Sequence, residues 1–153
     1  MATLHARTSS FDSIRVGDEL PILVKHEDQQ SIDNYAKYAP VGLREGWRNL
    51  HTEPAYAEQG IFGGTVNMGV ATVAYVAELL EKAFPLRNLM ARGSRLEMRA
   101  TEPFRAGDTV TFTGEVIEVS EDGGLGLVRC EVTGANQRDQ VVARARATVP
   151  FVR

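Results

Sequence analysis

The sequence predicts one α+β domain in which an antiparallel sheet wraps around a long buried helix. Residues 66–84 are apolar on nearly all sides, and a helix of this kind must be enclosed by other elements. After Pro85, apolar and polar residues alternate over four segments, as they do in strands with one buried face. Because these strands follow the helix instead of alternating with helices, the pattern is typical of the α+β class.

Length and composition favour a single globular domain. The chain has 153 residues, of which 43% are hydrophobic and 24% charged, and its formal net charge is −3. A mildly acidic chain without basic runs is not expected to bind nucleic acid, because that affinity depends on neutralising phosphates. The single Cys130 can form neither an internal disulfide nor a metal cluster, so we expect a core-facing thiol and no bound metal.

The N-terminal residues and the hydropathy pattern indicate the cellular compartment in which we expect the protein. Residues 1–10 are polar and lack the apolar stretch of a signal peptide, so we expect a loose leader before a domain of residues 11–153. No segment approaches the roughly 20 apolar residues that a membrane-spanning helix needs. We therefore expect a cytoplasmic protein that does not bind membranes.

Three elements are expected before the long helix. Residues 20–27 alternate enough to predict a first strand, and Asp28 is a good N-cap for a helix that Pro40 ends. Apolar residues recur at helical spacing within this helix, at Ile32, Tyr35, Ala36 and Ala39. A short helix follows later, with Pro54 in its first turn and Gly60 after its end.

Four strands are expected after the long helix. They are residues 94–100, 110–119, 127–133 and 141–149, separated by turns rich in glycine, proline, aspartate and asparagine. The apolar phase slips near Gly114, which predicts a β-bulge there. In the last strand alanines alternate with Arg144 and Arg146, so we expect these arginines on a solvated face of the sheet.

Two motifs before the long helix resemble a known family. Residues 49–57, Asn-Leu-His-Thr-Glu-Pro-Ala-Tyr-Ala, and residues 62–69, Phe-Gly-Gly-Thr-Val-Asn-Met-Gly, resemble the MaoC-like acyl dehydratases, which include the (R)-specific enoyl-CoA hydratases. The turns at residues 16–18 and 103–110 also resemble family turns. The resemblance implies a hot-dog fold, a dimer, and reversible conversion of a 2-enoyl-CoA into a 3-hydroxyacyl-CoA. The CoA thioester would be the substrate, and no cofactor is implied.

The family chemistry assigns roles to particular residues. Adding water to an enoyl thioester requires a proton acceptor for the water and hydrogen-bond donors for the thioester oxygen. His51 matches the family histidine and would be the acid/base. Gly63 and Gly64 match the small residues before the buried helix, and with Thr65 they form the expected substrate-binding segment. The amide groups at the start of that helix would bind the oxygen, because they lack partners within the helix.

The family loop G-D-x-N-P-x-H is only partly present. Its aspartate position is Gly46, and Met68 replaces a histidine that is frequent at the helix start. Three interpretations stay open. Glu45 could supply the missing carboxylate, Asn49 could orient the water while His51 alone moves protons, or the site could be incomplete. In the last case the chain would be a non-catalytic or co-catalytic acyl-CoA-binding subunit in a heterodimer with a second hot-dog chain, instead of a homodimer.

Several further residues have two possible roles. Trp47 could cap a substrate pocket or anchor its own loop, and Tyr75 could line an acyl tunnel or pack in the core. Glu53 is expected to favour the start of the short helix at Pro54. A hot-dog thioesterase would need an acidic residue on the buried helix, and Glu78 lies near the far end of that helix.

Overall fold

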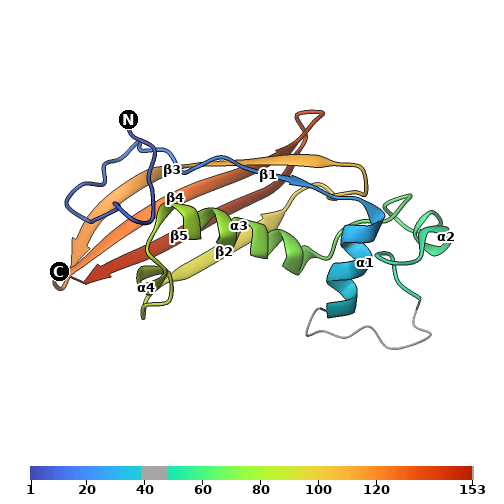
Figure 1. The fold of residues 1–153 in the computed structure, drawn as a ribbon, viewed down its shortest axis with the longest axis horizontal. Helices are drawn as coiled ribbons and strands as arrows, with labels where there is room; N and C mark the ends of the chain where they lie inside the picture. Colours follow the sequence, from blue (N-terminus) through green and yellow to red (C-terminus); the bar gives the residue numbers. More distant parts are fainter. Residues whose placement is uncertain (39–47, 153) are drawn as a thin grey trace.

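The computed structural model of the chain describes residues 1–38 and 48–152 (Figure 1). The expected irregular loop therefore falls largely outside the described residues, and so do Glu45, Gly46 and Trp47. Five strands form one sheet: β1 Leu23–His26, β2 Arg95–Ala100, β3 Thr109–Asp122, β4 Leu125–Asn136 and β5 Val141–Val152. Their order in the sheet is β1-β3-β4-β5-β2, and every neighbouring pair is antiparallel.

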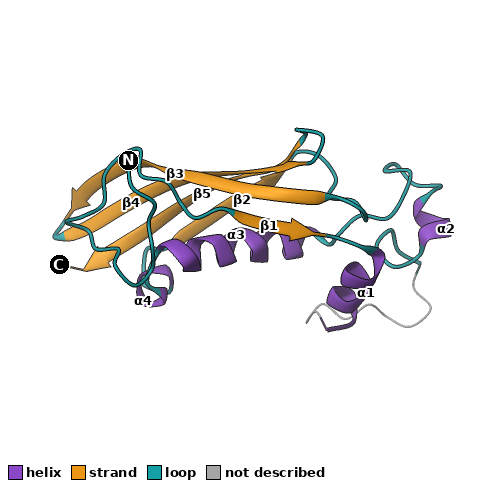
Figure 2. Ribbon diagram, turned by 45° about the horizontal axis from the view of Figure 1, so that its top comes forward, coloured by secondary structure: helices purple, strands orange, loops and turns teal. Residues whose placement is uncertain are grey.

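The long helix α3, Gly69–Ala83, lies along one face of this sheet (Figure 2). The predicted α+β class is thereby confirmed. Six residues of α3 are buried against the sheet: Ala71, Thr72, Val76, Leu79, Leu80 and Ala83. The expectation that α3 is enclosed on all sides is wrong for the single chain. Val70 is 49% exposed and Val73 is 37% exposed, because the sheet covers only one side of the helix.

Three shorter helices complete the described fold: α1 Gln29–Tyr38, α2 Pro54–Ala57 and α4 Leu86–Leu89. Asp28 caps α1 as predicted, since its Oδ1 accepts the amide of Ser31 at 2.7 Å. Pro54 occupies the first turn of α2 as predicted. The helix α1 lies near the N-terminal end of α3, and α2 lies farther out at the same end of the molecule, beyond the sheet (Figure 1). Loops and helix ends therefore gather at this end of the molecule.

Residues 1–10 are not a loose leader, because they pack against the body of the domain. Leu4 is buried in the core, and the amide of Ala6 donates to the carbonyl of Lys82 at 2.8 Å. The amide of Ala2 donates to Oδ1 of Asp18 at 2.9 Å, and this hydrogen bond lowers the pKa of the Asp18 carboxyl. The segment closes the end of the fold near the C-terminus of α3.

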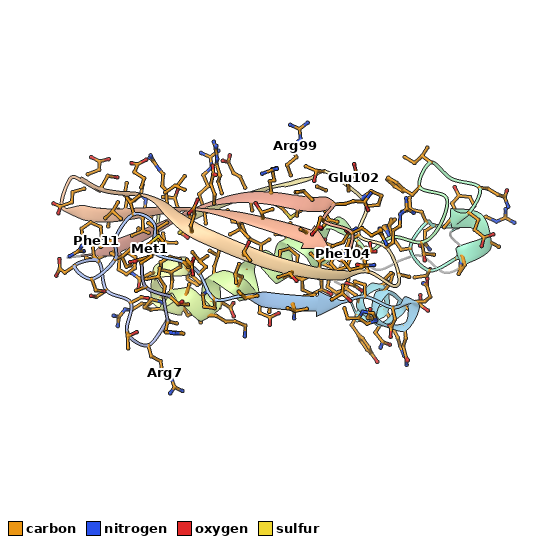
Figure 3. All side chains as sticks on the ribbon, turned by 90° about the horizontal axis from the view of Figure 1, so that it is seen from above. Met1, Arg7, Phe11, Arg99, Glu102 and Phe104 are labelled. Carbon is orange, nitrogen blue, oxygen red and sulfur yellow. The ribbon has the colours of Figure 1, made fainter. Side chains whose placement is uncertain are left out.

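The core lies between α3 and the sheet. Its largest members, Phe84 and Phe112, are fully buried, and Phe104 lies among them. Charged side chains such as Arg7 and Arg99 instead point away from the body of the molecule (Figure 3). Within residues 1–38 and 48–152, no helix combines the length and the apolar character that a membrane span requires.

Cys130 faces this core from β4, as the sequence predicts, and its thiol is inaccessible. Burial raises the pKa of the Cys130 thiol to about 12, so the reactive thiolate is scarce in the folded protein at neutral and mildly alkaline pH. We expect iodoacetamide at pH 8 to leave the native protein unmodified and to alkylate it fully in denaturant. Mass spectrometry of the intact protein measures both reactions. Rapid alkylation of the native protein would contradict the buried position.

Candidate active site

His51 lies in the loop before α2, and its ring contacts the segment that leads into α3. The His51 Nδ1 atom lies 2.9 Å from the carbonyl oxygen of Val66, and the amide of Val66 donates to the carbonyl of Leu50 at 3.3 Å. Because a carbonyl oxygen can only accept, His51 Nδ1 carries a hydrogen, and in the neutral ring Nε2 is then the nitrogen with the lone pair. The second ring nitrogen is therefore available as a base.

Asn49 shapes the His51 loop through its side chain. Its Oδ1 accepts the amides of His51 at 2.8 Å and Thr52 at 2.9 Å, and its Nδ2 donates to the Thr52 hydroxyl at 2.9 Å. A side-chain oxygen that binds the amides two and three residues ahead imitates a backbone turn. The amide of Asn49 in turn donates to the Glu53 carboxylate at 3.2 Å. These contacts support a loop-forming role for both side chains.

Gln29, the first residue of α1, joins the His51 loop to the segment before α3. Its Nε2 donates to the carbonyl of His51 at 2.9 Å, and its Oε1 accepts the hydroxyl of Thr65 at 2.6 Å. Thr65 is only 8% exposed. Gln29 was not singled out from the sequence, because a polar residue in the first turn of a helix is ordinary.

Gly63 and Gly64 form a tight turn between α2 and α3. The φ angle of Gly63 is 62°, a conformation that disfavours other residues, and the Gly64 amide donates to the carbonyl of Ala57 at 3.1 Å. The guanidinium of Arg105 donates from Nη1 to the carbonyl of Phe62. A Cβ atom on Gly64 would lie 3.8 Å from this nitrogen. The turn thus presents bare backbone beside a cation.

The start of α3 lies next to this turn. Asn67 is held by two hydrogen bonds: its amide donates to the carbonyl of Phe104 at 2.8 Å, and its Nδ2 donates to the Thr72 hydroxyl at 2.9 Å. The N-cap residue Met68 provides no side-chain hydrogen bond to the helix. The amide of Ala71 donates to the carbonyl of Met68 at 2.8 Å. The two amides before it, of Gly69 and Val70, come too early in α3 to have an acceptor within the helix, and they suit a developing oxyanion.

The structure thus brings His51, Asn49 and the segment of Gly63, Gly64 and Thr65 together at the N-terminal end of α3. Tyr75, the other candidate for this region, packs with Phe104 and Phe112 at ring separations of 6.2 and 6.3 Å. Its hydroxyl donates to the buried Glu27 carboxylate at 2.6 Å. Burial, and then this bond to a carboxylate, raise the pKa of Tyr75.

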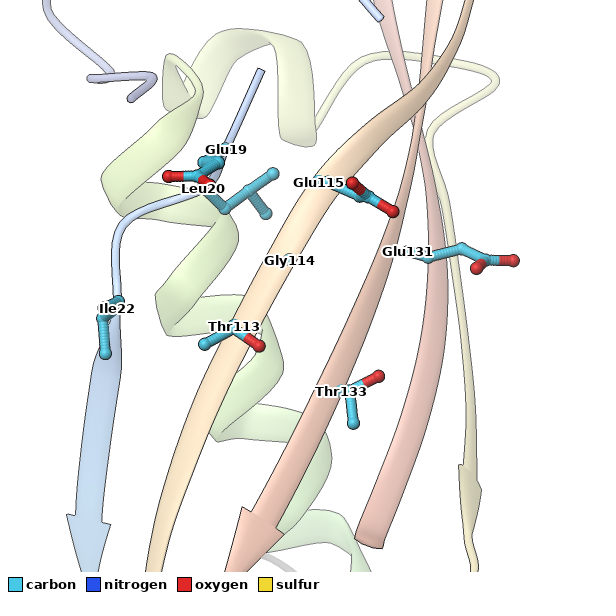
Figure 4. A pocket seen from close by; sticks show the side chains of 8 residues that line it. All are labelled: Glu19, Leu20, Ile22, Thr113, Gly114, Glu115, Glu131 and Thr133. Atoms are coloured by element: carbon cyan, nitrogen blue, oxygen red, sulfur yellow. The ribbon is translucent and has the colours of Figure 1, made fainter. Parts of the chain in front are cut away.

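The carboxylate of Glu78 and a cluster of carboxylates on the sheet do not form an active site for acyl-CoA chemistry. Glu78 on α3 forms an ion pair with Lys25 at 2.5 Å, which disfavours the thioesterase alternative. A hollow of about 320 Å³ on the outer face of the sheet is lined by Glu19, Glu115 and Glu131, with α3 behind the strands (Figure 4). Its acidic lining would repel a CoA ester, which carries phosphate groups.

Residues 38–136 match the family model of the MaoC-like domain, which covers more than half of the chain. The chain belongs to the MaoC-like domain family. His51, the Gly63–Gly64 turn and Arg105 all lie within the matched residues. A search of curated protein sequences gives no significant match.

Solved structures show that this MaoC-like chain has the hot-dog fold. The MaoC-like dehydratase from Rhodospirillum rubrum is 23% identical with a TM-score of 0.73, over 93% of this chain and 95% of that one. The (R)-hydratase from A. caviae, involved in PHA biosynthesis, is 22% identical with a TM-score of 0.68, over 90% and 96%. The ChsH1–ChsH2 complex from Mycobacterium tuberculosis contains a chain that is 21% identical with a TM-score of 0.66, over 90% and 98%.

Proposed function

We propose that this MaoC-like protein catalyses the reversible addition of water to a 2-enoyl-CoA, forming a 3-hydroxyacyl-CoA. The observation that supports this most directly is the hydrogen bond from His51 Nδ1 to the carbonyl of Val66. It orients the imidazole at the segment leading into α3 and, in the neutral ring, assigns the lone pair to Nε2. A base held beside helix amides combines the two requirements of the reaction.

In the proposed reaction, His51 Nε2 takes a proton from a water molecule while the water oxygen bonds to the β-carbon of the substrate. The electron pair of the carbon–carbon double bond moves toward the thioester, and the amides of Gly69 and Val70 at the start of α3 stabilise the resulting negative oxygen. The protonated His51 Nε2 then gives its proton to the α-carbon, so the double bond becomes single and the imidazole returns to its starting state. Asn49 holds the loop that carries His51. Glu45 remains the candidate for a second acid, although it lies outside the described residues.

The acyl thioester would lie over Gly63 and Gly64, where no side chain occupies the surface of the turn. Thr65 would support this turn, because its hydroxyl is already engaged by Gln29. Trp47, which also lies outside the described residues, is the candidate for covering the substrate. No cofactor takes part in this scheme, and we expect it to operate in the cytoplasm without a nucleic-acid or membrane partner.

The direct test mixes the purified protein with short, medium and aromatic 2-enoyl-CoAs and follows the loss of enoyl absorbance. We expect at least one substrate to be hydrated to an equilibrium mixture. The hypothesis of a self-sufficient hydratase fails if all reactions stay flat while the folded protein binds saturated acyl-CoAs.

A heteromeric subunit is the second candidate function. Gly46 and Met68 replace two polar family residues, and a chain of the ChsH1–ChsH2 complex has the same fold. The exposed Val70 and Val73 on α3 also suit contact with a second hot-dog chain, identical or different. Co-expression with a hot-dog chain that retains the full G-D-x-N-P-x-H loop tests this role. Activity that needs both chains and survives His51→Ala would place the chemistry on the partner.

Gln29 is expected to act as a positioning residue for this reaction. Gln29→Ala removes the bonds to the His51 carbonyl and the Thr65 hydroxyl, so the backbone that carries the imidazole loses its connection to α1 and to the segment before α3. We expect kcat to fall about 10- to 100-fold while KM stays within about twofold, as small misplacements of reacting groups produce. Gln59→Ala is the matched control, because Gln59 donates only within its own region, to the carbonyl of Ala55. An unchanged kcat in Gln29→Ala would contradict this role.

A further inference from the structure

Arg105 lies between β2 and β3 and contacts the same segment as His51. Its backbone pairs with Val66 in an isolated antiparallel bridge, and its guanidinium donates to the carbonyl of Phe62. His51 contacts the carbonyl of Val66, four residues further along. Four residues span at most about 14 Å when fully extended, so both side chains belong to one region of the surface.

The guanidinium of Arg105 is partly buried and has one acceptor in the described structure. Four other arginines form ion pairs with carboxylates: Arg95, Arg129, Arg138 and Arg146. Across residues 1–38 and 48–152, no carboxylate lies within ion-pair distance of Arg105. The nearby Asp108 accepts the Arg105 backbone amide and pairs instead with the Arg138 side chain at 2.8 Å. The remaining donors of the Arg105 fork are thus available to a ligand.

The position of this cation beside Gly64 determines what it can reach. The bond to Phe62 fixes one nitrogen of the fork, and the absence of a Cβ on Gly64 leaves the adjoining space open. A guanidinium binds carboxylate and phosphate oxygens through paired hydrogen bonds, and partial burial strengthens those bonds. A purely structural contact to Phe62 would not require a permanent positive charge at this place.

We propose that Arg105 binds an anionic oxygen group of the substrate where the substrate crosses the Gly63–Gly64 turn. The inference rests on the acyl-CoA site proposed above and adds a recognition residue to it. The shared chemistry is a phosphate or carboxylate oxygen pair facing the guanidinium. A carboxylate carried by the acyl group is the favoured source, because the acyl thioester is placed over this turn and the pantetheine arm separates it from the phosphates of coenzyme A. Binding to those phosphates is the alternative that the test distinguishes.

Calorimetric binding of unreactive ligands separates the two sources without depending on turnover. The ligands are butyryl-CoA, S-butyryl-pantetheine, which lacks phosphates, and succinyl-CoA, which adds a terminal carboxylate. They are compared in the unmodified protein, Arg105→Gln and Arg105→Lys. Arg144→Gln is the matched control, because Arg144 is an exposed arginine without an ion pair in the described part of the chain. Thermal unfolding establishes that each variant is folded.

If the phosphates are the source, Arg105→Gln weakens binding of butyryl-CoA about 10- to 100-fold, the range expected for a charge-assisted hydrogen bond, and leaves S-butyryl-pantetheine unchanged. If an acyl carboxylate is the source, the loss is confined to succinyl-CoA. In either case Arg105→Lys retains part of the affinity, and Arg144→Gln retains all of it. Equal affinities of Arg105→Gln and unmodified protein for all three ligands would overturn the proposal. Arg105-dependent binding without hydration of any enoyl-CoA would reject the hydratase and retain the anion contact.

Discussion

Replacing His51 by alanine is expected to lower kcat/KM for enoyl-CoA hydration by about 10²- to 10⁴-fold, the usual contribution of a positioned general acid–base. The reason is local, because the Nδ1 bond to Val66 leaves Nε2 as the proton acceptor beside the start of α3. Initial rates of enoyl absorbance loss at several substrate concentrations give kcat and KM separately. We expect the loss mainly in kcat, since the imidazole acts on water and not on the acyl group.

His51→Asn is the sharper variant of this experiment. An asparagine amide can still donate toward the Val66 carbonyl but has no basic nitrogen, so it preserves a donor and removes the base. His26→Ala is the matched control, because His26 is exposed and bonds the Thr109 hydroxyl at 2.9 Å on β3. If His51→Asn retains more than a tenth of the activity while His26→Ala is unchanged, His51 is not the acid–base.

The fold class could be predicted because hydrophobic periodicity reports burial directly. The uniformly apolar stretch became α3, and the alternating segments became β2 to β5. Capping was equally local, so Asp28 at the start of α1 was predicted correctly. Each of these features depends on residues within a few positions of one another, and such local patterns can be recognised in a single sequence.

Features set by distant contacts were predicted less well. A β-bulge was expected near Gly114, but the register of β3 and β4 shifts between Val116 and Glu118. Gly114 instead allows close packing, since a Cβ there would lie 2.8 Å from the backbone oxygen of Glu131. Likewise, the polar residues 1–10 gave no sign that Leu4 enters the core. The exposed side of α3 also could not be predicted, because apolarity does not specify which chain covers a helix.

In the candidate site, too, the local features were predicted and the features set by distant contacts were not. The motif around His51 marks the loop and the turn at Gly63 and Gly64, because both lie in short ordered runs. Gln29 and Arg105 contact these runs across separations of 22 and 43 residues, and neither belongs to a motif that indicates such contacts. Only the folded chain shows that a helix start and a strand connection converge on the segment before α3.

Replacing Phe112 by alanine is expected to lower the free energy of unfolding by about 3–5 kcal/mol, the typical cost of deleting a buried phenylalanine ring. Phe112 is fully buried on β3 and faces Gly134, its direct partner on β4. Urea denaturation followed by circular dichroism measures the change. Val24→Ala is the matched control, since Val24 is 55% exposed on the neighbouring β1 and should change stability by less than about 0.5 kcal/mol.

Gly134→Ala makes this experiment specific for the contact between the two strands. A Cβ on Gly134 would lie 2.6 Å from the Phe112 ring, so this variant alone should lose about 1–3 kcal/mol through overpacking. In the Phe112→Ala background the same methyl group enters the space that the ring has vacated, and its cost should fall to the smaller part caused by Val110, whose Cγ1 would lie 3.2 Å away. The two changes are therefore expected to be non-additive by at least about 1 kcal/mol. Losses that add to within about 0.5 kcal/mol would show that the ring and the glycine are not packed against each other. The pairing of Phe112 with Gly134 in the β3–β4 register would then be wrong.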